Sequence, residues 1–182
     1  MSTSNMLLGT SGKTLIMQLI PGNSSTGFAG TLSMSGDGNY IATFDYFSPL
    51  YVYLIVYVRI GATFVHQQTL TLPLSLRYDS ICFDDTGQRC VVGGSNGGLD
   101  IQRGNAAVYV RSGSTWSLEQ DLTPLVGLAD YDEFGYDVSI SGDGNYVAIG
   151  SPRTGNGTFP SPGGLGNGAV YTFVRSGLSN NK

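Results

Sequence analysis

One acidic cluster has the residue types and spacing that could hold a metal ion. Its carboxylates lie close together in the segment ADYDEFGYD, at Asp130, Asp132, Glu133 and Asp137. Oxygen ligands of this kind bind hard cations such as Ca²⁺. The same composition would suit an acidic segment that only connects two of the repeated units described below. We favour that interpretation. We therefore expect no cofactor, with calcium at these carboxylates as the alternative.

The other polar residues form no catalytic set in the sequence. His66 is the only histidine, and no nucleophile or carboxylate is tied to it by spacing. Residues 9–14, GTSGKT, resemble a phosphate-binding loop, but that motif requires a glycine five positions before Gly12, where this chain has Leu7. We therefore expect a protein that is not an enzyme.

The two cysteines, Cys82 and Cys90, flank one expected hairpin turn. The expected pairing places Phe83 opposite Cys90 and Cys82 opposite Val91. Because neighbouring residues of a strand point to opposite faces of the sheet, the two thiols cannot form a disulfide. We expect both cysteines to be free and buried.

A ligand or partner would most readily bind at the variable loops. Residues 151–168 form an insertion rich in Gly, Pro, Ser and Asn, with counterparts at residues 94–104 and 45–52. Loops from one strand junction emerge on one rim of a repeat protein, where partners commonly bind. Aromatic rings with neighbouring amides could bind a carbohydrate. The candidate ligand residues are Tyr46, Phe47, Trp116, Arg153 and Phe159.

The charge and the length of the apolar runs argue against nucleic-acid binding and against membrane insertion. Among 182 residues, 9 are basic and 13 are acidic, so the net charge is −4, and no Lys/Arg cluster could neutralise a run of phosphates. The most apolar run, residues 50–58, is far shorter than the roughly 20 residues of a membrane-spanning helix, and its Tyr and Val residues favour a buried strand. We expect neither nucleic-acid binding nor membrane insertion. The N-terminus also lacks the basic region of a signal peptide.

The sequence contains three copies of one repeat, and most of the residues discussed above lie in these copies or in the segments that follow them. Residues 28–44 (FAGTLSMSGDGNYIATF), 77–93 (RYDSICFDDTGQRCVVG) and 134–150 (FGYDVSISGDGNYVAIG) align without gaps. The copies begin about 50 residues apart, a spacing typical of propeller blades and other repeat arrays. Apolar residues alternate on both sides of each turn, which predicts a β-hairpin. With Ile140 opposite Val147, the loop is GDGN, whose glycines and asparagine readily adopt positive φ angles.

Two further strands are expected to follow each hairpin. The third strands are residues 54–59, 106–111 and 169–175, and fourth strands follow at residues 65–72 and 118–123. Four antiparallel strands make one blade of a β-propeller. We therefore expect an all-β fold of three four-stranded antiparallel repeats that are β-propeller-like blades. Another threefold all-β fold, such as a β-prism or a trefoil, is the alternative.

The third copy carries a specific family resemblance. FGYDVSISGDGNYVAIGSP followed by GNGAVYTFVRSG resembles an FG-GAP repeat of the integrin-alpha-like β-propeller family, with Phe134-Gly135 as the FG and residues 150–152 (GSP) in the GAP place. The resemblance implies a β-propeller. It also implies a calcium loop of the form DxDxDG within the blade, but the equivalent loops here, GDGN and DTGQ, have too few carboxylates.

The third repeat has no fourth strand after it in the sequence. Residues 12–21 (GKTLIMQLIP) resemble the fourth-strand segment GSTWSLEQDLTP. We expect Leu15, Met17 and Leu19 to pair with the strand that carries Val170 and Val174, either within one chain or between chains. The single domain, residues 1–182, then divides into a closing strand (1–27), repeat 1 (28–76), repeat 2 (77–133) and repeat 3 without its last strand (134–182).

These features favour a non-enzymatic structural or interaction protein. Propellers typically have four to eight blades, and unpaired blade edges favour assembly, for example of two chains into one ring. We expect a homo-oligomer joined through its terminal blade edges, a building block of an extracellular, cell-surface or virion assembly that contacts a protein or glycan. A carbohydrate-binding, lectin-like module is the alternative.

Overall fold

The computed structural model describes residues 27–48, 51–72, 76–97, 103–122, 132–154 and 167–176. All the regular secondary structure in these ranges consists of β-strands. The same ranges contain no helix long and apolar enough to span a membrane. The expected closing strand with Leu15, Met17 and Leu19 lies outside the described residues, as do Asp130, Phe159 and the side chain of Phe47.

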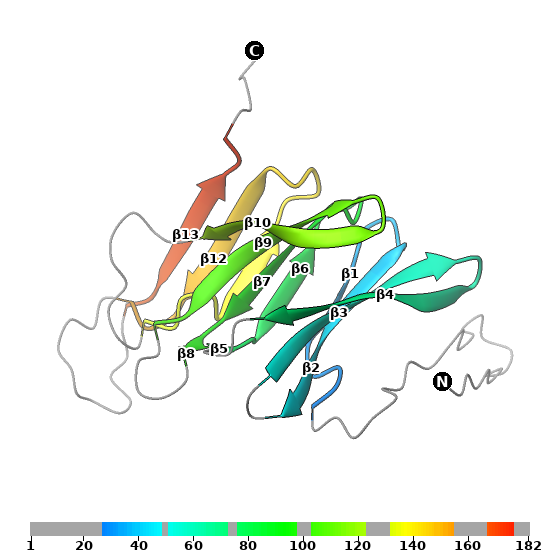
Figure 1. Cartoon of the computed structure of the whole chain (residues 1–182). Coiled ribbons are helices and arrows are strands. Elements are labelled where there is room, and N and C mark those ends of the chain that lie inside the picture. The colour runs from blue at the N-terminus through cyan, green and yellow to red at the C-terminus, as the bar shows by residue number, and fades with distance from the viewer. Residues whose placement is uncertain are drawn as a thin grey trace, which may run out of the picture.

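The first sheet contains four antiparallel strands in the order β1-β2-β3-β4. Each strand lies antiparallel beside the previous one along the chain (Figure 1). Its strands are β1 (Leu32–Met34), β2 (Tyr40–Ser48), β3 (Tyr51–Ile60) and β4 (Thr63–Leu72).

The second sheet has the same topology, with the order β6-β7-β9-β10. Its strands are β6 (Ser80–Phe83), β7 (Arg89–Gly94), β9 (Asn105–Ser112) and β10 (Thr115–Leu122). A separate pair, β5 (Leu76–Arg77) and β8 (Asn96–Gly97), flanks this sheet.

The third sheet has three described strands, in the order β11-β12-β13. They are β11 (Asp137–Ile140), β12 (Tyr146–Ser151) and β13 (Ala169–Val174). The predicted all-β class is thus confirmed, as antiparallel sheets of four, four and three strands that are compatible with propeller-like blades.

The hairpin registers also agree with the sequence pattern. Ile140 lies opposite Val147, Phe83 opposite Cys90 and Cys82 opposite Val91. Both cysteines are free, as expected, although only Cys90 is fully buried and Cys82 is half-buried. The alternation of apolar residues therefore fixed the register, because a slip by one residue would turn each buried side chain to the opposite face.

The three sheets stack face to face, with the second sheet between the other two (Figure 1). One apolar layer separates the first and second sheets and includes Phe44, Leu54 and Phe83. Another lies between the second and third sheets and includes Val91 and Phe134. Burying one such side chain contributes about 1.5–3 kcal/mol to stability, so the two layers hold the stack together.

Candidate interaction surfaces

The repeated word SGDGN forms a hydrogen-bonded turn at one end of the strands. Asp37 accepts hydrogen bonds from the Ser35 hydroxyl (2.6 Å), the Asn39 main chain (2.9 Å) and the Asn39 side chain (2.8 Å). Burial acts to raise the pKa of Asp37, but the hydrogen bonds from Ser35 and Asn39 lower it overall. Both carboxylate oxygens therefore stabilise the turn.

The third repeat makes the same turn around Asp143. Its carboxylate accepts hydrogen bonds from Ser141 Oγ (2.5 Å), Asn145 N–H (3.1 Å) and Asn145 Nδ2 (2.9 Å). The bonds from Ser141 and then Asn145 hold the pKa of Asp143 below its usual value. Gly144 has a φ of 71°, as the predicted turn requires.

The second repeat uses a different carboxylate for this purpose. Asp84 takes the sequence place of Ser35 and Ser141, and its buried side chain accepts the main-chain N–H groups of Gln88 (2.9 Å) and Arg89 (3.0 Å). The repeats therefore differ in the position of the acidic residue within the turn, while the turn itself is the same.

The three turns lie in line across the stack. Asp37 N–H donates to Asp85 O (2.7 Å), and Asp85 N–H donates to Gly142 O (3.0 Å). A Cβ at Gly36 would lie 2.6 Å from a carboxylate oxygen of Asp85, and a Cβ at Gly142 would also clash with that carboxylate. These glycines are therefore needed for the close approach of neighbouring turns.

A tyrosine and a glycine form a tight contact between the first two sheets. The Tyr40 ring occupies the space that a Cβ at Gly87 would need. The guanidinium carbon of Arg111 lies 4.5 Å from the ring centroid of Tyr40, and Arg111 Nε also donates to Gly87 O (2.9 Å). This set of three residues fixes the separation of the sheets near their turns.

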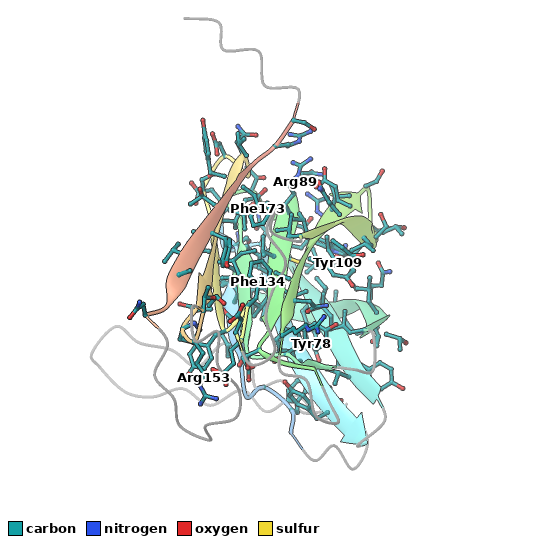
Figure 2. The ribbon with its side chains drawn as sticks, turned by 90° about the vertical axis from the view of Figure 1, so that its left-hand side faces the viewer. Tyr78, Arg89, Tyr109, Phe134, Arg153 and Phe173 are labelled. Carbon is teal, nitrogen blue, oxygen red and sulfur yellow. The ribbon has the colours of Figure 1, made fainter. Side chains whose placement is uncertain are left out.

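Phe134 and Gly135 pack the third sheet against the second. Phe134 is fully buried, and its ring lies edge to face with Tyr171 at a centroid distance of 5.2 Å. Figure 2 shows Phe134 and Phe173 between the two sheets. Gly135 has a φ of 90°, and a Cβ there would clash with the carbonyl of Asn105. The FG pair therefore combines a large apolar side chain with a residue that has none.

The described residues of the acidic cluster each interact with a different part of the protein. Glu133 forms an ion pair with Arg153 (3.0 Å), and Asp137 accepts a hydrogen bond from Ser80 Oγ (2.8 Å). Asp132 is buried, and its main-chain oxygen accepts a hydrogen bond from Ser151 Oγ (2.7 Å). In the described ranges, no group of three or more His, Cys, Asp or Glu side chains could hold a metal ion.

The candidate ligand residues that are described do not form one site. Trp116 is buried in the first core layer, where its indole N–H donates to Gln67 (2.9 Å), so no face of its ring is open to a ligand. Tyr46 is half-buried, and its hydroxyl donates to the main-chain oxygen of Tyr78. Arg153 is partly exposed and lies at the opposite end of the strands from Arg89 (Figure 2).

Each outer face of the stack carries a group of exposed apolar side chains, although other residues on the outer face of the first sheet, such as Tyr57, are buried. On the outer face of the first sheet, Leu32 and Met34 are 61% and 52% exposed. On the outer face of the third sheet, Tyr146, Val170 and Val174 are 56%, 73% and 62% exposed. We call these two groups the first and second end faces. The sequence predicts Val170 and Val174 as assembly residues but not Tyr146, although Tyr146 begins an alternating apolar strand.

One segment of the chain matches a known repeat family. Residues 116–173 match the FG-GAP repeat family. The match begins at Trp116 in β10 and ends at Phe173 in β13, and it includes Phe134 and Gly135. A comparison with curated proteins finds no match.

The match confirms, for this segment, the resemblance to an FG-GAP repeat that the sequence predicted. The repeat is consistent with a β-propeller-like family and indicates an interaction module of that type. FG-GAP repeats generally belong to non-enzymatic interaction modules.

Proposed function

We propose that this protein is a non-enzymatic building block that assembles with other protein chains through its two end faces. The observation that carries the proposal is a difference in burial between equivalent positions. Leu32 and Met34 align with Ile81 and Phe83 in the next repeat, which are only 7% and 6% exposed because the first sheet covers them. The first end face thus has the character of an internal sheet-to-sheet interface.

The second end face has matching properties. Tyr146 lies opposite Val174 in neighbouring strands, so both side chains belong to one face of the third sheet. Burial of apolar surface contributes roughly 25 cal/mol per Å², and clustered exposed apolar residues commonly mark protein interfaces. We propose a homo-oligomer, since one chain carries both faces.

The polar composition supports an assembly of this kind. Only 12% of the residues are charged, and the polar surface depends instead on hydroxyl and amide groups. A low density of charge reduces repulsion between copies. We propose that the assembly belongs to an extracellular, cell-surface or virion structure.

Analytical ultracentrifugation across a broad range of concentration tests the proposed assembly. We expect the full chain to form an oligomer, and Met34→Glu to shift it toward the monomer without loss of thermal stability. Leu118→Glu is the matched control, because Leu118 is also half-exposed but lies on the outer strand of the second sheet. A wild-type chain that stays monomeric, or equal effects of the two variants, would overturn the proposal.

A further inference from the structure

We propose that the two end faces bind each other head to tail, so that the third sheet of one copy packs on the first sheet of the next. This inference rests on the proposed function and adds the partner surface and its pairing. Inside the chain, two interfaces between successive sheets already show how one repeat packs on the next.

The residues that face the preceding sheet are equivalent in all three repeats. Ile81 and Phe83 of β6 pack against the first sheet, and Val138 and Ile140 of β11 pack against the second. Their counterparts in β1, Leu32 and Met34, are exposed. The first end face is therefore the surface on which a preceding sheet would pack.

The residues that face the following sheet show the complementary arrangement. Ala42 of β2 is buried against the second sheet, and its counterpart Val91 of β7 is buried against the third. The counterpart in β12 is Ala148, next to the exposed Tyr146 on the second end face. The second end face is therefore the surface on which a following sheet would pack, and the two faces are halves of one interface.

The contact of Tyr40 with Gly87 and Arg111 specifies this pairing further. At the second internal interface, Arg89 takes the place of Tyr40 and lies beside Gly144, 3.5 Å from where a Cβ of that glycine would lie. A side chain of one repeat thus lies beside the turn glycine of the next at both interfaces, although Asp84 Oδ2 is nearer to the Gly144 position than Arg89 is, and the described cation–π contact belongs to the first interface.

The equivalent residues at the end faces lack this contact within their own chain. Tyr146 corresponds to Tyr40, Gly38 to Gly87 and Arg59 to Arg111. A Cβ at Gly38 would meet no atom of the described residues within 4 Å, whereas the space at Gly87 is filled by Tyr40. We infer that the Tyr146 ring of one copy lies on Gly38 and beneath Arg59 of the next.

The backbone places Arg59 correctly for this contact. The main-chain N–H of Arg59 donates to Asn39 O (2.8 Å), as Arg111 N–H donates to Gln88 O (2.9 Å). The exposed guanidinium of Arg59 is held beside the turn by two hydrogen bonds to Asn39 Oδ1 (2.7 and 3.2 Å). A cation is thus held near Gly38, where it would complement the π face of Tyr146.

A head-to-tail contact has a consequence for the form of the assembly. It joins two different faces, so successive copies form a closed ring or an open filament. Two copies that continue the internal rotation between sheets would give a ring within the four-to-eight-blade range of propellers.

Mixing two single-face variants tests the head-to-tail pairing. Met34→Glu blocks the first end face, and Val174→Glu blocks the second. In a head-to-tail assembly every contact contains both faces, so each variant alone is monomeric. A mixture forms a heterodimer, because the intact second face of one variant meets the intact first face of the other. Ultracentrifugation and native mass spectrometry measure these species.

Other outcomes separate the pairing from the broader proposal. If Val174→Glu alone still forms dimers while Met34→Glu does not, the first faces bind each other, and only the head-to-tail inference is overturned. If neither variant reduces assembly, both the inference and the proposed function are overturned. Leu32→Lys repeats the test of the first end face if Met34→Glu does not fold.

The contact between Tyr146 and Arg59 has its own test. We expect Tyr146→Leu and Arg59→Gln each to weaken assembly by about twofold to fivefold, with little further loss in the double variant. Arg175→Gln is the control, because Arg175 occupies the equivalent backbone position in the third sheet, away from the proposed contact. Fully additive effects of the two substitutions would overturn this pairing.

Discussion

The guanidinium of Arg111 in the second sheet lies over the ring of Tyr40 in the first, with 4.5 Å between the guanidinium carbon and the ring centroid. The Tyr40 ring also fills the space beside Gly87. The sheets can approach this closely only because the turn at Gly87 carries no side chain. One interface therefore depends on an aromatic ring, a cation and a glycine from residues far apart in the sequence.

Gly87→Ala tests this dependence. Gly87 and Gly113 have nearly the same φ, 60° and 59°, but a Cβ at Gly113 would meet nothing within 4 Å in the part of the chain that the structure describes. We expect Gly113→Ala to lower the free energy of unfolding by about 1–2 kcal/mol through backbone strain alone. Gly87→Ala should cost about 1–3 kcal/mol more, because its methyl group clashes with Tyr40. Equal losses in denaturant unfolding would show that the ring moves aside freely.

Phe134→Ala tests the FG pair. Phe134 is fully buried between the second and third sheets, so its removal leaves a large cavity. We expect a loss of about 3–5 kcal/mol in the free energy of unfolding. Tyr136→Ala is the nearby control, because Tyr136 is 54% exposed, and it should change stability by less than about 0.5 kcal/mol. Similar losses would contradict a core role specific to Phe134.

The strands and their registers could be predicted from the sequence because they depend on local patterns. Alternating apolar residues and the GDGN turn were enough to pair Ile140 with Val147 and Phe83 with Cys90. The family match at residues 116–173 likewise agrees with the FG signature at Phe134 and Gly135. Turn chemistry and period-two alternation act over a few residues, so one sequence reveals them.

The packing between sheets could not be predicted in the same way. The sequence offers Trp116 as a ligand residue, but its ring is buried in the core between the first two sheets, where Gln67 and Gln68 of β4 accept its indole and main-chain N–H groups. Gly36 and Gly142 lie in the repeated SGDGN turns, and their lack of a side chain also makes room for Asp85. These contacts join different repeats, and no local pattern encodes which face meets which.

Thiol labelling tests the placement of the two cysteines. Cys82 is half-buried and Cys90 is fully buried, and burial raises the pKa of the Cys90 thiol far above its usual value. Since the thiolate is the reactive form, we expect a thiol reagent to modify Cys82 first in the native protein. Both should react at similar rates in denaturant. Mass spectrometry locates the label, and the variant Cys82→Ser should show almost no native labelling. Faster labelling of Cys90 would contradict the assigned register of β6 and β7.

The acid stability of the two SGDGN turns follows from the lowered pKa values of Asp37 and Asp143. A carboxylate whose pKa is lower in the folded state stabilises the fold above its unfolded pKa of about 4, and this contribution is lost as the pH falls through the folded pKa. We expect the double variant Asp37→Asn/Asp143→Asn to be less stable than the wild type at neutral pH, and the difference to shrink below about pH 4. Asp121→Asn, at an exposed strand position outside the turns, is the control for the removal of a carboxylate. Denaturant unfolding at several pH values measures the effect. A difference that stays constant with pH would show that the carboxylate charge does not stabilise these turns.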